Sequence, residues 1–180
     1  RLTAYALHRS AIRRERHTCR SAPVNTNLNH FYPVRESENV RISLAECGSE
    51  QPEFAARKMA YTPYSHFQVG AALLTEKGGI YRGCNIENAA YTPTNCAERT
   101  AFFKAVSEGE RSFTAIAVVG GPEGASEFDW CAPCGVCRQV MKEFCHEDVF
   151  QIILARSVKE YKVYTLAELL PMGFGPDNLQ

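Results

Sequence analysis

The 180-residue sequence lacks a net charge, because 20 Lys and Arg balance 20 Asp and Glu. A protein that binds nucleic acid through a broadly basic composition is therefore not expected. The sequence also lacks long hydrophobic runs: apolar stretches such as residues 152–155 are far shorter than the ~20 residues of a membrane-spanning helix. Its eight cysteines are too sparse for a small disulfide scaffold, and their clustering suggests metal or redox chemistry in a reducing compartment. The length fits a single domain.

Acidic residues are scarce at the beginning of the sequence, where residues 1–35 contain seven Arg and one acid, Glu15. This part carries a charge of +6, and residues 36–180 carry −6. We interpret residues 1–40 as a disordered or targeting-like extension, because they show no sustained periodicity, and residues 41–180 as the domain. The expected location is cytoplasmic, or organellar if residues 1–40 are a transit peptide.

Strand and helix patterns alternate after the extension. The predicted strands cover residues 67–74, 80–85, 115–119, 149–155 and 161–164. The predicted helices cover residues 53–59, 96–108, 134–144 and 166–170. This order predicts an α/β protein with a mixed sheet of about five strands, in which an antiparallel hairpin is followed by parallel crossovers.

Cysteines stand at the beginning of two of these helices. Cys96 opens one helix, and Cys134 and Cys137 open the other in the sequence Pro-Cys-Gly-Val-Cys. Three thiolates on Zn²⁺ leave a formal charge of −1, which two helix N-termini would stabilise, and Arg99 could add a hydrogen-bonded counter-charge. Three protein ligands leave the fourth tetrahedral position for water, as is typical of a catalytic zinc. We therefore expect one Zn²⁺ per chain.

Glu98 follows Cys96 by two residues and is expected beside the metal without being a ligand. Zinc lowers the pKa of its water to about 7, and a carboxylate here can take a proton from that water and deliver it to a substrate nitrogen. A Cys-x-Glu motif followed by Pro-Cys-x-x-Cys is the known signature of zinc-dependent nucleobase deaminases.

Two alternatives use the same thiols differently. A closed structural zinc site would add Cys131 as a fourth ligand, but it leaves Glu98 without a purpose. A redox dithiol of Cys134 and Cys137 would make the Cys-x-Glu motif a coincidence. The remaining cysteines and the histidines are interpreted as having no ligand role. A zinc-stabilised binding module without turnover stays open as an alternative function.

From residue 53 to residue 179 the sequence resembles the small, homotetrameric, zinc-dependent cytidine deaminases. Five motifs in order carry the resemblance: YSHFQVGAAL at 64–73, GCNIENA at 83–89, CAERTA at 96–101, PCGVCRQV at 133–140 and LLPMGFGP at 169–176. The resemblance implies a three-layer α-β-α fold. It also implies hydrolytic deamination of cytidine and 2′-deoxycytidine to the uridine forms with release of ammonia, a reaction of pyrimidine salvage. Another aminopyrimidine nucleoside is the alternative substrate.

The resemblance further implies individual roles in the reaction. Cys96, Cys134 and Cys137 would hold zinc, while Glu98 would shuttle protons as zinc-activated water attacks C4 of cytosine. Ala132 stands where the family usually has serine, which removes one hydrogen bond near the leaving group.

Substrate binding is implied for a second group of residues. Phe67 would lie beside the base, and the backbone amide of Ala97 would hold the pyrimidine carbonyl. Asn85 and Glu87 would hold the sugar hydroxyls. Phe174 corresponds to an aromatic residue that reaches the pocket of a neighbouring subunit, so the active sites would be shared within a homotetramer. Tyr91 is a second candidate for this contact. The charge of −6 on residues 36–180 argues against a polynucleotide substrate.

Overall fold

The computed structural model of the chain describes residues 51–179. The predicted extension of residues 1–40 and its boundary with the domain lie outside the described residues. Within the described range, no helix has the length and apolar character that crossing a membrane requires.

The described elements follow the predicted order. The strands are β1 (Phe67–Thr75), β2 (Ile80–Cys84), β3 (Phe113–Pro122), β4 (Gln151–Ala155) and β5 (Tyr161–Thr165). The helices are α2 (Pro52–Arg57), α3 (Ala97–Ser107), α4 (Gly135–Phe144) and α5 (Leu166–Leu169), followed by the 3-10 helix η1 (Pro176–Leu179). Each predicted element is present, and its predicted and observed ends differ by at most three residues. Such differences are usual, because local contacts decide whether the last turn of a helix or the last pair of a strand forms.

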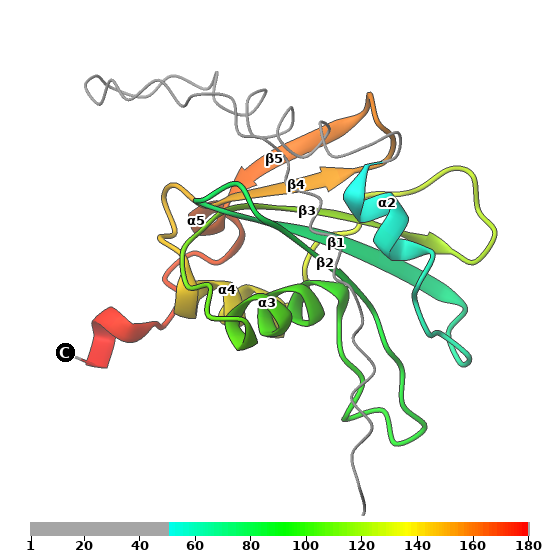
Figure 1. Cartoon of the computed structure of the whole chain (residues 1–180), viewed down its shortest axis with the longest axis horizontal. Helices are drawn as coiled ribbons and strands as arrows, with labels where there is room; N and C mark the ends of the chain where they lie inside the picture. Colours follow the sequence, from blue (N-terminus) through cyan, green and yellow to red (C-terminus); the bar gives the residue numbers. More distant parts are fainter. Residues whose placement is uncertain (1–50, 180) are drawn as a thin grey trace, which may run out of the picture. The chain divides into compact units, whose positions relative to one another are not determined.

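The five strands form one sheet in the order β2-β1-β3-β4-β5 (Figure 1). β1 pairs antiparallel with both β2 and β3, so the connection from β2 through α3 to β3 joins strands that run in the same direction. β3 and β4 are parallel and are joined through α4. The predicted hairpin and parallel crossovers are therefore confirmed, and β5 adds an antiparallel edge to β4.

Two glycines show how the helices approach the sheet. A Cβ at Gly70 would lie 2.0 Å from the backbone oxygen of Glu53 in α2. A Cβ at Gly83 would lie 2.2 Å from the backbone oxygen of Ala97 in α3. Gly83 pairs with Ala71, the neighbour of Gly70, and neighbouring residues of a strand face opposite sides of the sheet. The helix α2 thus covers one face, while α3 and α4 cover the other, in a three-layer arrangement (Figure 1).

The larger core cluster lies between the sheet and the helices α3 and α4. It contains Phe102 from α3, Met141 from α4, and Ile116 and Ile152 from the sheet, none of which exposes any surface. Each large apolar side chain buried in this way contributes about 1.5–3 kcal/mol to folding. Through this packing, α3 and α4 lie side by side on one face of the sheet, and their N-termini lie close together.

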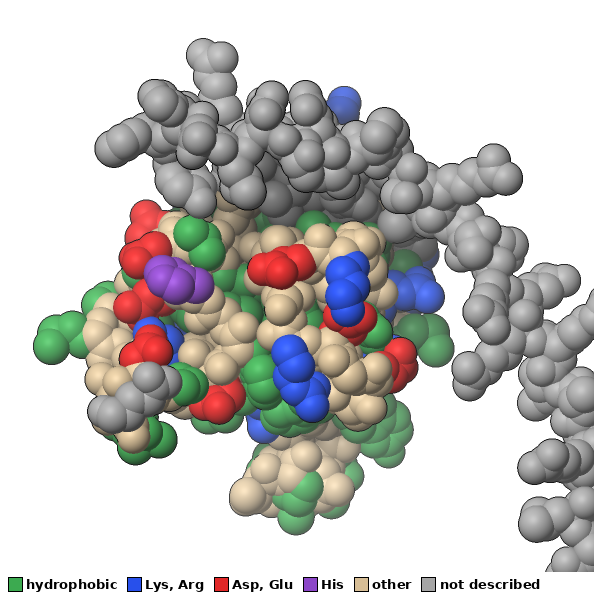
Figure 2. Space-filling view, turned by 60° about the vertical axis from the view of Figure 1, so that its left-hand side comes forward, with side chains coloured by type: hydrophobic (Ala, Val, Ile, Leu, Met, Phe, Trp, Pro, Cys, Tyr) green, Lys and Arg blue, Asp and Glu red, His purple; other side chains and the backbone are tan. Residues whose placement is uncertain are grey.

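The described surface carries charges of both signs. On the face drawn in Figure 2, the acidic and basic side chains are interspersed and form no continuous basic strip. A polyanion that is held by clustered Lys and Arg finds no such cluster on this face.

Candidate active site and metal centre

The two helices of the predicted metal site begin at cysteines. Cys96 is the N-cap of α3 and Cys134 is the N-cap of α4, and both have an extended backbone. Neither side chain caps its own helix with a hydrogen bond. Since the first backbone N–H groups of a helix lack intrahelical partners, both N-termini direct positive dipole ends toward the thiols.

The sulfur atoms of the predicted zinc ligands lie together in the fold. The Sγ of Cys134 is 3.8 Å from that of Cys96 and 3.5 Å from that of Cys137. Sulfurs at tetrahedral positions 2.3 Å from a zinc ion are about 3.8 Å apart. The spacing and the chemistry of the three donors therefore fit Zn²⁺.

Cys96 and Cys137 have opposite pKa shifts. Hydrogen bonds from Cys137, Arg99 and Cys134 outweigh burial and lower the pKa of Cys96 to about 5. The pKa of Cys137 is raised, because this thiol donates to Cys96 and is buried. The metal-free cluster thus holds a thiolate at Cys96 and a proton at Cys137, and zinc binding releases the proton of Cys137.

Arg99 lies in the first turn of α3, beside the cluster. Its Nη2 donates to the backbone oxygen of Thr94 at 3.0 Å and to the Sγ of Cys96 at 3.8 Å. The guanidinium is therefore located where a counter-charge for the thiolates is expected.

Glu98 lies in the first turn of α3 and is only 4% exposed. Burial above all, together with the charge of Cys96, raises the pKa of its carboxyl from 4.5 to about 7, against the opposing effects of hydrogen bonds and Arg99. A carboxyl with this pKa gains and loses a proton near neutral pH, as a general acid and base requires.

Cys131 does not belong to the metal-binding group. Among the described residues, the only group of three or more potential ligands contains Cys96, Cys134 and Cys137. Cys131 packs against Gly120, and burial raises the pKa of its thiol to about 11. The closed four-thiol site is therefore not favoured.

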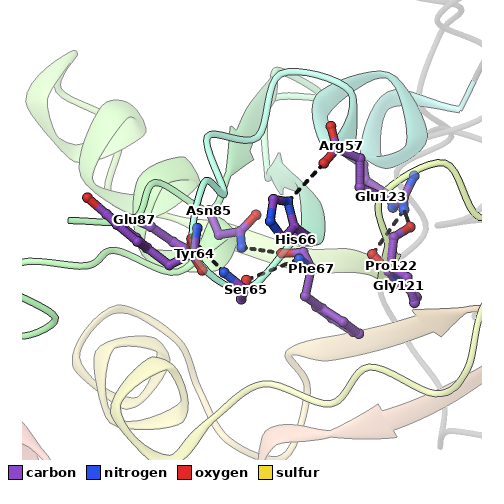
Figure 3. Close-up of polar contacts among 10 residues, drawn as sticks. All are labelled: Arg57, Tyr64, Ser65, His66, Phe67, Asn85, Glu87, Gly121, Pro122 and Glu123. Carbon is purple, nitrogen blue, oxygen red and sulfur yellow. Dashed lines mark hydrogen bonds and ion pairs between the residues drawn. The ribbon is translucent and has the colours of Figure 1, made fainter. Parts of the chain in front are cut away.

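Asn85 is bound to the beginning of β1 (Figure 3). Its Oδ1 accepts from the backbone N–H of Val69, and its Nδ2 donates to the backbone oxygen of Phe67, both at 2.8 Å. The amide keeps a second Nδ2 proton and a second Oδ1 lone pair for another partner. It therefore joins the β2 side of the site to the segment that carries Phe67.

Glu87 accepts two backbone hydrogen bonds from the same loop. Its Oε2 receives the N–H of Tyr64 at 3.0 Å and the N–H of Ser65 at 3.2 Å (Figure 3). The Ser65 side chain and these backbone donors hold the pKa of Glu87 below its ordinary value. The carboxylate is thus ionised, and it has acceptor capacity for a further hydrogen-bond donor.

A hollow of about 250 Å³ adjoins Glu87 and is lined by Tyr64, Ser65, Glu87, Tyr91 and Thr94. The rings of Tyr64 and Tyr91 lie 6.3 Å apart. Tyr91 has a left-handed backbone (φ 59°) and is 74% exposed. A polar acceptor between aromatic walls is suited to a small, partly apolar, hydroxyl-bearing ligand.

Phe67 is not a core residue, since 40% of its surface is exposed. A Cβ added to Gly120 would lie 3.2 Å from the Phe67 ring and 2.5 Å from the sulfur of Cys131. The ring therefore packs over Gly120 beside the segment that leads to Cys134. Ala97, the first residue of α3, is fully buried, and its N–H is among those without an intrahelical partner.

Phe174 is 58% exposed, yet its backbone is held in place. Gln139 of α4 donates from Nε2 to the backbone oxygen of Phe174 at 2.8 Å, and its neighbour Arg138 donates to the backbone oxygens of Pro133 and Leu169. Sequence inspection assigns no role to Arg138 or Gln139. The one feature of the sequence that could have pointed to them is their position directly after Cys137.

The comparisons with known proteins agree with this geometry. The family model for the cytidine and deoxycytidylate deaminase zinc-binding region matches residues 51–153. The cytidine deaminase of Sporosarcina psychrophila is 55% identical over 124 residues, which are 69% of this chain and 87% of that relative. The probable cytidine deaminase of Dictyostelium discoideum is 40% identical over 124 residues, which are 69% of this chain and 80% of that relative.

Solved structures match as well. A cytidine deaminase from Burkholderia pseudomallei has 46% sequence identity and a TM-score of 0.61, with 68% of this chain and 94% of that chain covered. One from Mycobacterium tuberculosis has 35% identity and a TM-score of 0.57, with 69% of this chain and 92% of that chain covered. These matches define a zinc-binding deaminase domain. The chain belongs to the cytidine and deoxycytidylate deaminase family, and the resemblance seen in its motifs is confirmed.

Proposed function

We propose that this protein is a zinc-dependent cytidine deaminase that converts cytidine and 2′-deoxycytidine to uridine and 2′-deoxyuridine. The observation that carries the proposal is a three-sulfur cluster at two helix N-termini with a buried carboxyl, Glu98, whose pKa is about 7. The names of the relatives support the same substrate class.

The chemistry divides between the metal and the chain. When bound by Cys96, Cys134 and Cys137, zinc supplies a Lewis acid that makes water acidic enough to react near neutral pH. Glu98 accepts the proton of the attacking water and delivers protons to the pyrimidine and then to the amino nitrogen. Oxygen adds at C4, the C4–N bond breaks, and the nitrogen leaves as ammonia. The N–H groups of the two helices and Arg99 offset the negative charge of the thiolates.

Substrate placement follows from the residues around the cluster. The exposed ring of Phe67 offers a face for the base, and the N–H of Ala97 offers a donor for the pyrimidine carbonyl. Asn85 and Glu87 offer a donor and acceptors to the sugar hydroxyls. A nucleoside is favoured over a polynucleotide, because a carboxylate repels phosphate and residues 36–180 carry a charge of −6.

We further propose a homotetramer in which active sites are shared. The backbone of Phe174 is held by Gln139 while its ring is exposed, and Tyr91 is exposed in the segment between β2 and α3. A large exposed aromatic on a fixed backbone is typical of an interface anchor. A mixture of Phe174→Ala and Glu98→Ala subunits, refolded together, should recover activity that neither variant has alone. Recovery that never exceeds the separate activities would contradict the sharing of sites.

We propose that the reaction serves pyrimidine salvage. We also propose that the protein works in a reducing compartment, the cytoplasm. The six cysteines that the structure describes form no disulfide, and free thiolate ligands persist where the cell keeps thiols reduced.

The decisive test separates catalysis from metal binding. Glu98→Ala should keep one zinc per chain and the fold but lose deamination, measured by the absorbance change from cytidine to uridine. Glu108→Ala, at the exposed far end of α3, is the matched control and should keep wild-type activity. An active Glu98→Ala enzyme would refute the mechanism. A wild-type, zinc-loaded protein that turns over no aminopyrimidine nucleoside would favour a binding module instead.

A further inference from the structure

Arg57 joins two strands at the edge of the site, although it lies on the face of the sheet opposite to the thiol cluster. It ends α2, and its residue is only 7% exposed. Its Nε donates to the backbone oxygen of Gln68 in β1 at 3.1 Å, and its Nη2 donates to the backbone oxygens of Gly121 and Pro122 in β3 at 3.0 and 2.5 Å. Figure 3 shows the guanidinium directed at the end of β3.

The guanidinium suits this position because its donors diverge in one plane. Three carbonyl oxygens from two strands converge on it, and the ring of Phe128 lies 4.5 Å below its carbon. The carbonyl dipoles and the ring face stabilise the buried cation. A lysine ammonium is a compact charge without this planar arrangement of donors, so it cannot donate to the carbonyls of both strands in the same way.

The strands that Arg57 joins carry Phe67. In the register of β1 and β3, Gln68 lies opposite Gly121 and Phe67 lies opposite Pro122. Arg57 therefore binds the backbone of the residue next to Phe67 together with the β3 residues that face both positions. The Phe67 ring itself packs over Gly120, the preceding residue of β3.

The beginning of β1 is thus held from two sides. Asn85 holds the backbone oxygen of Phe67 and the N–H of Val69 from the β2 side. Arg57 holds Gln68 from the β3 side, where the ladder ends and the loop to Phe128 begins. Without Arg57, three backbone carbonyls lose a charged donor. The strand end that presents the Phe67 ring is then held to β3 by the end of the ladder alone.

We infer that Arg57 is a positioning residue for the deaminase reaction, which sets the Phe67 ring against the substrate base by fastening the ends of β1 and β3. This inference rests on the proposed role of Phe67. A Phe67 ring that is already held in place loses little conformational freedom when it stacks on the base. Arg57 is therefore expected to strengthen substrate binding.

The test is a double-mutant cycle in the zinc-loaded full chain, with KM and kcat for cytidine as the readout. Phe67→Ala should raise KM roughly 5- to 150-fold, the range for loss of base stacking. Arg57→Met should raise KM about fivefold or more, with one zinc retained per chain and a smaller change in kcat. In the Phe67→Ala background, Arg57→Met should add less than about twofold, because its effect acts through that ring.

Two further variants keep the cycle interpretable. Arg57→Lys retains the charge and should give a KM between those of the wild type and Arg57→Met, which also provides a folded variant if Arg57→Met unfolds. Arg82→Met removes an exposed arginine of β2, and its KM should equal that of the wild type. Thermal unfolding is measured for each variant to confirm that it is folded at the assay temperature.

The possible failures are distinguishable. An unchanged KM in the folded Arg57 variants, or an equal increase in both backgrounds, overturns the positioning role while the large effect of Phe67→Ala stands. A Phe67→Ala enzyme with wild-type KM overturns the stacking role of Phe67 and, with it, the role inferred for Arg57.

Discussion

Replacing Glu98 by glutamine should make the zinc-free protein more stable while it abolishes catalysis. The carboxyl is buried, and its pKa is raised from 4.5 to about 7. A group whose pKa is raised on folding contributes stability below its unfolded pKa and loses that contribution as the pH rises through the folded value. At about 1.36 kcal/mol per pKa unit, the ionised carboxylate therefore destabilises the folded chain by about 3 kcal/mol above pH 7.

Glutamine has nearly the same shape and never ionises. In denaturant unfolding of the chelated protein, Glu98→Gln should gain up to about 3 kcal/mol over the wild type at pH 8 and less than about 1 kcal/mol at pH 5. In the zinc-loaded protein the gain should be smaller, because the cation attracts the carboxylate. Deamination at pH 7 should fall by at least about 10²- to 10⁴-fold, the usual contribution of general acid–base catalysis.

The pH dependence of the stability difference distinguishes an effect of the charge from an effect of packing. An equal stability difference at pH 5 and pH 8 would show that glutamine acts through packing and not through the missing charge. Glu108→Gln, at the exposed end of the same helix, is the control: its carboxylate contacts only the Tyr81 hydroxyl among the interactions described, so it should leave the rate unchanged and show no gain in stability between pH 5 and pH 8.

The remaining predictions concern the metal ligands and the packing of the layers. Cys134→Ser should bind less than one zinc per chain and melt at a lower temperature, whereas Cys131→Ser should keep one zinc; metal analysis with thermal unfolding distinguishes the two. Stoichiometric zinc in Cys134→Ser would point to Cys131 as a ligand. Gly70→Ala should destabilise the fold by at least about 1–3 kcal/mol, because its Cβ would lie 2.0 Å from a backbone oxygen of α2. Gly135→Ala meets nothing within 4 Å and should unfold near the wild-type midpoint, so equal midpoints for both would contradict the close approach of α2.

The elements of the domain could be predicted because their signals are local. The hairpin of β1 and β2 follows from alternation around the Gly78-Gly79 turn, and α3 and α4 follow from helical spacing after Cys96 and Cys134. Residues near one another in sequence determine these patterns, so no long-range contact is needed to recognise them.

The candidate metal centre could also be predicted from the sequence, for a chemical reason. Thiolates are good zinc ligands, and ligands of one ion must stand on elements that can meet; two helices on one face of a sheet satisfy this condition. The structure brings the three sulfurs within 4.8 Å of one another, as the motif requires.

The interactions around the substrate side could not be predicted in the same way. Arg57 binds Gly121 across 64 residues of sequence, and neither residue stands in a motif that marks the contact. Asn85 and Glu87 were assigned to sugar hydroxyls, and the structure shows that both also hold the backbone of the loop that carries Phe67. Such bonds depend on which strands become neighbours.

The sequence alone thus predicted the candidate ligand set and the acid–base candidate, which depend on side-chain chemistry, and it determined the order of strands and helices, which follows from short-range periodicity. Only the tertiary structure decided that Glu98 is buried with a pKa near 7 and that Arg57 fastens β1 to β3. Burial and convergence of carbonyls are properties of packed neighbours, and packing places side by side residues that the chain keeps far apart.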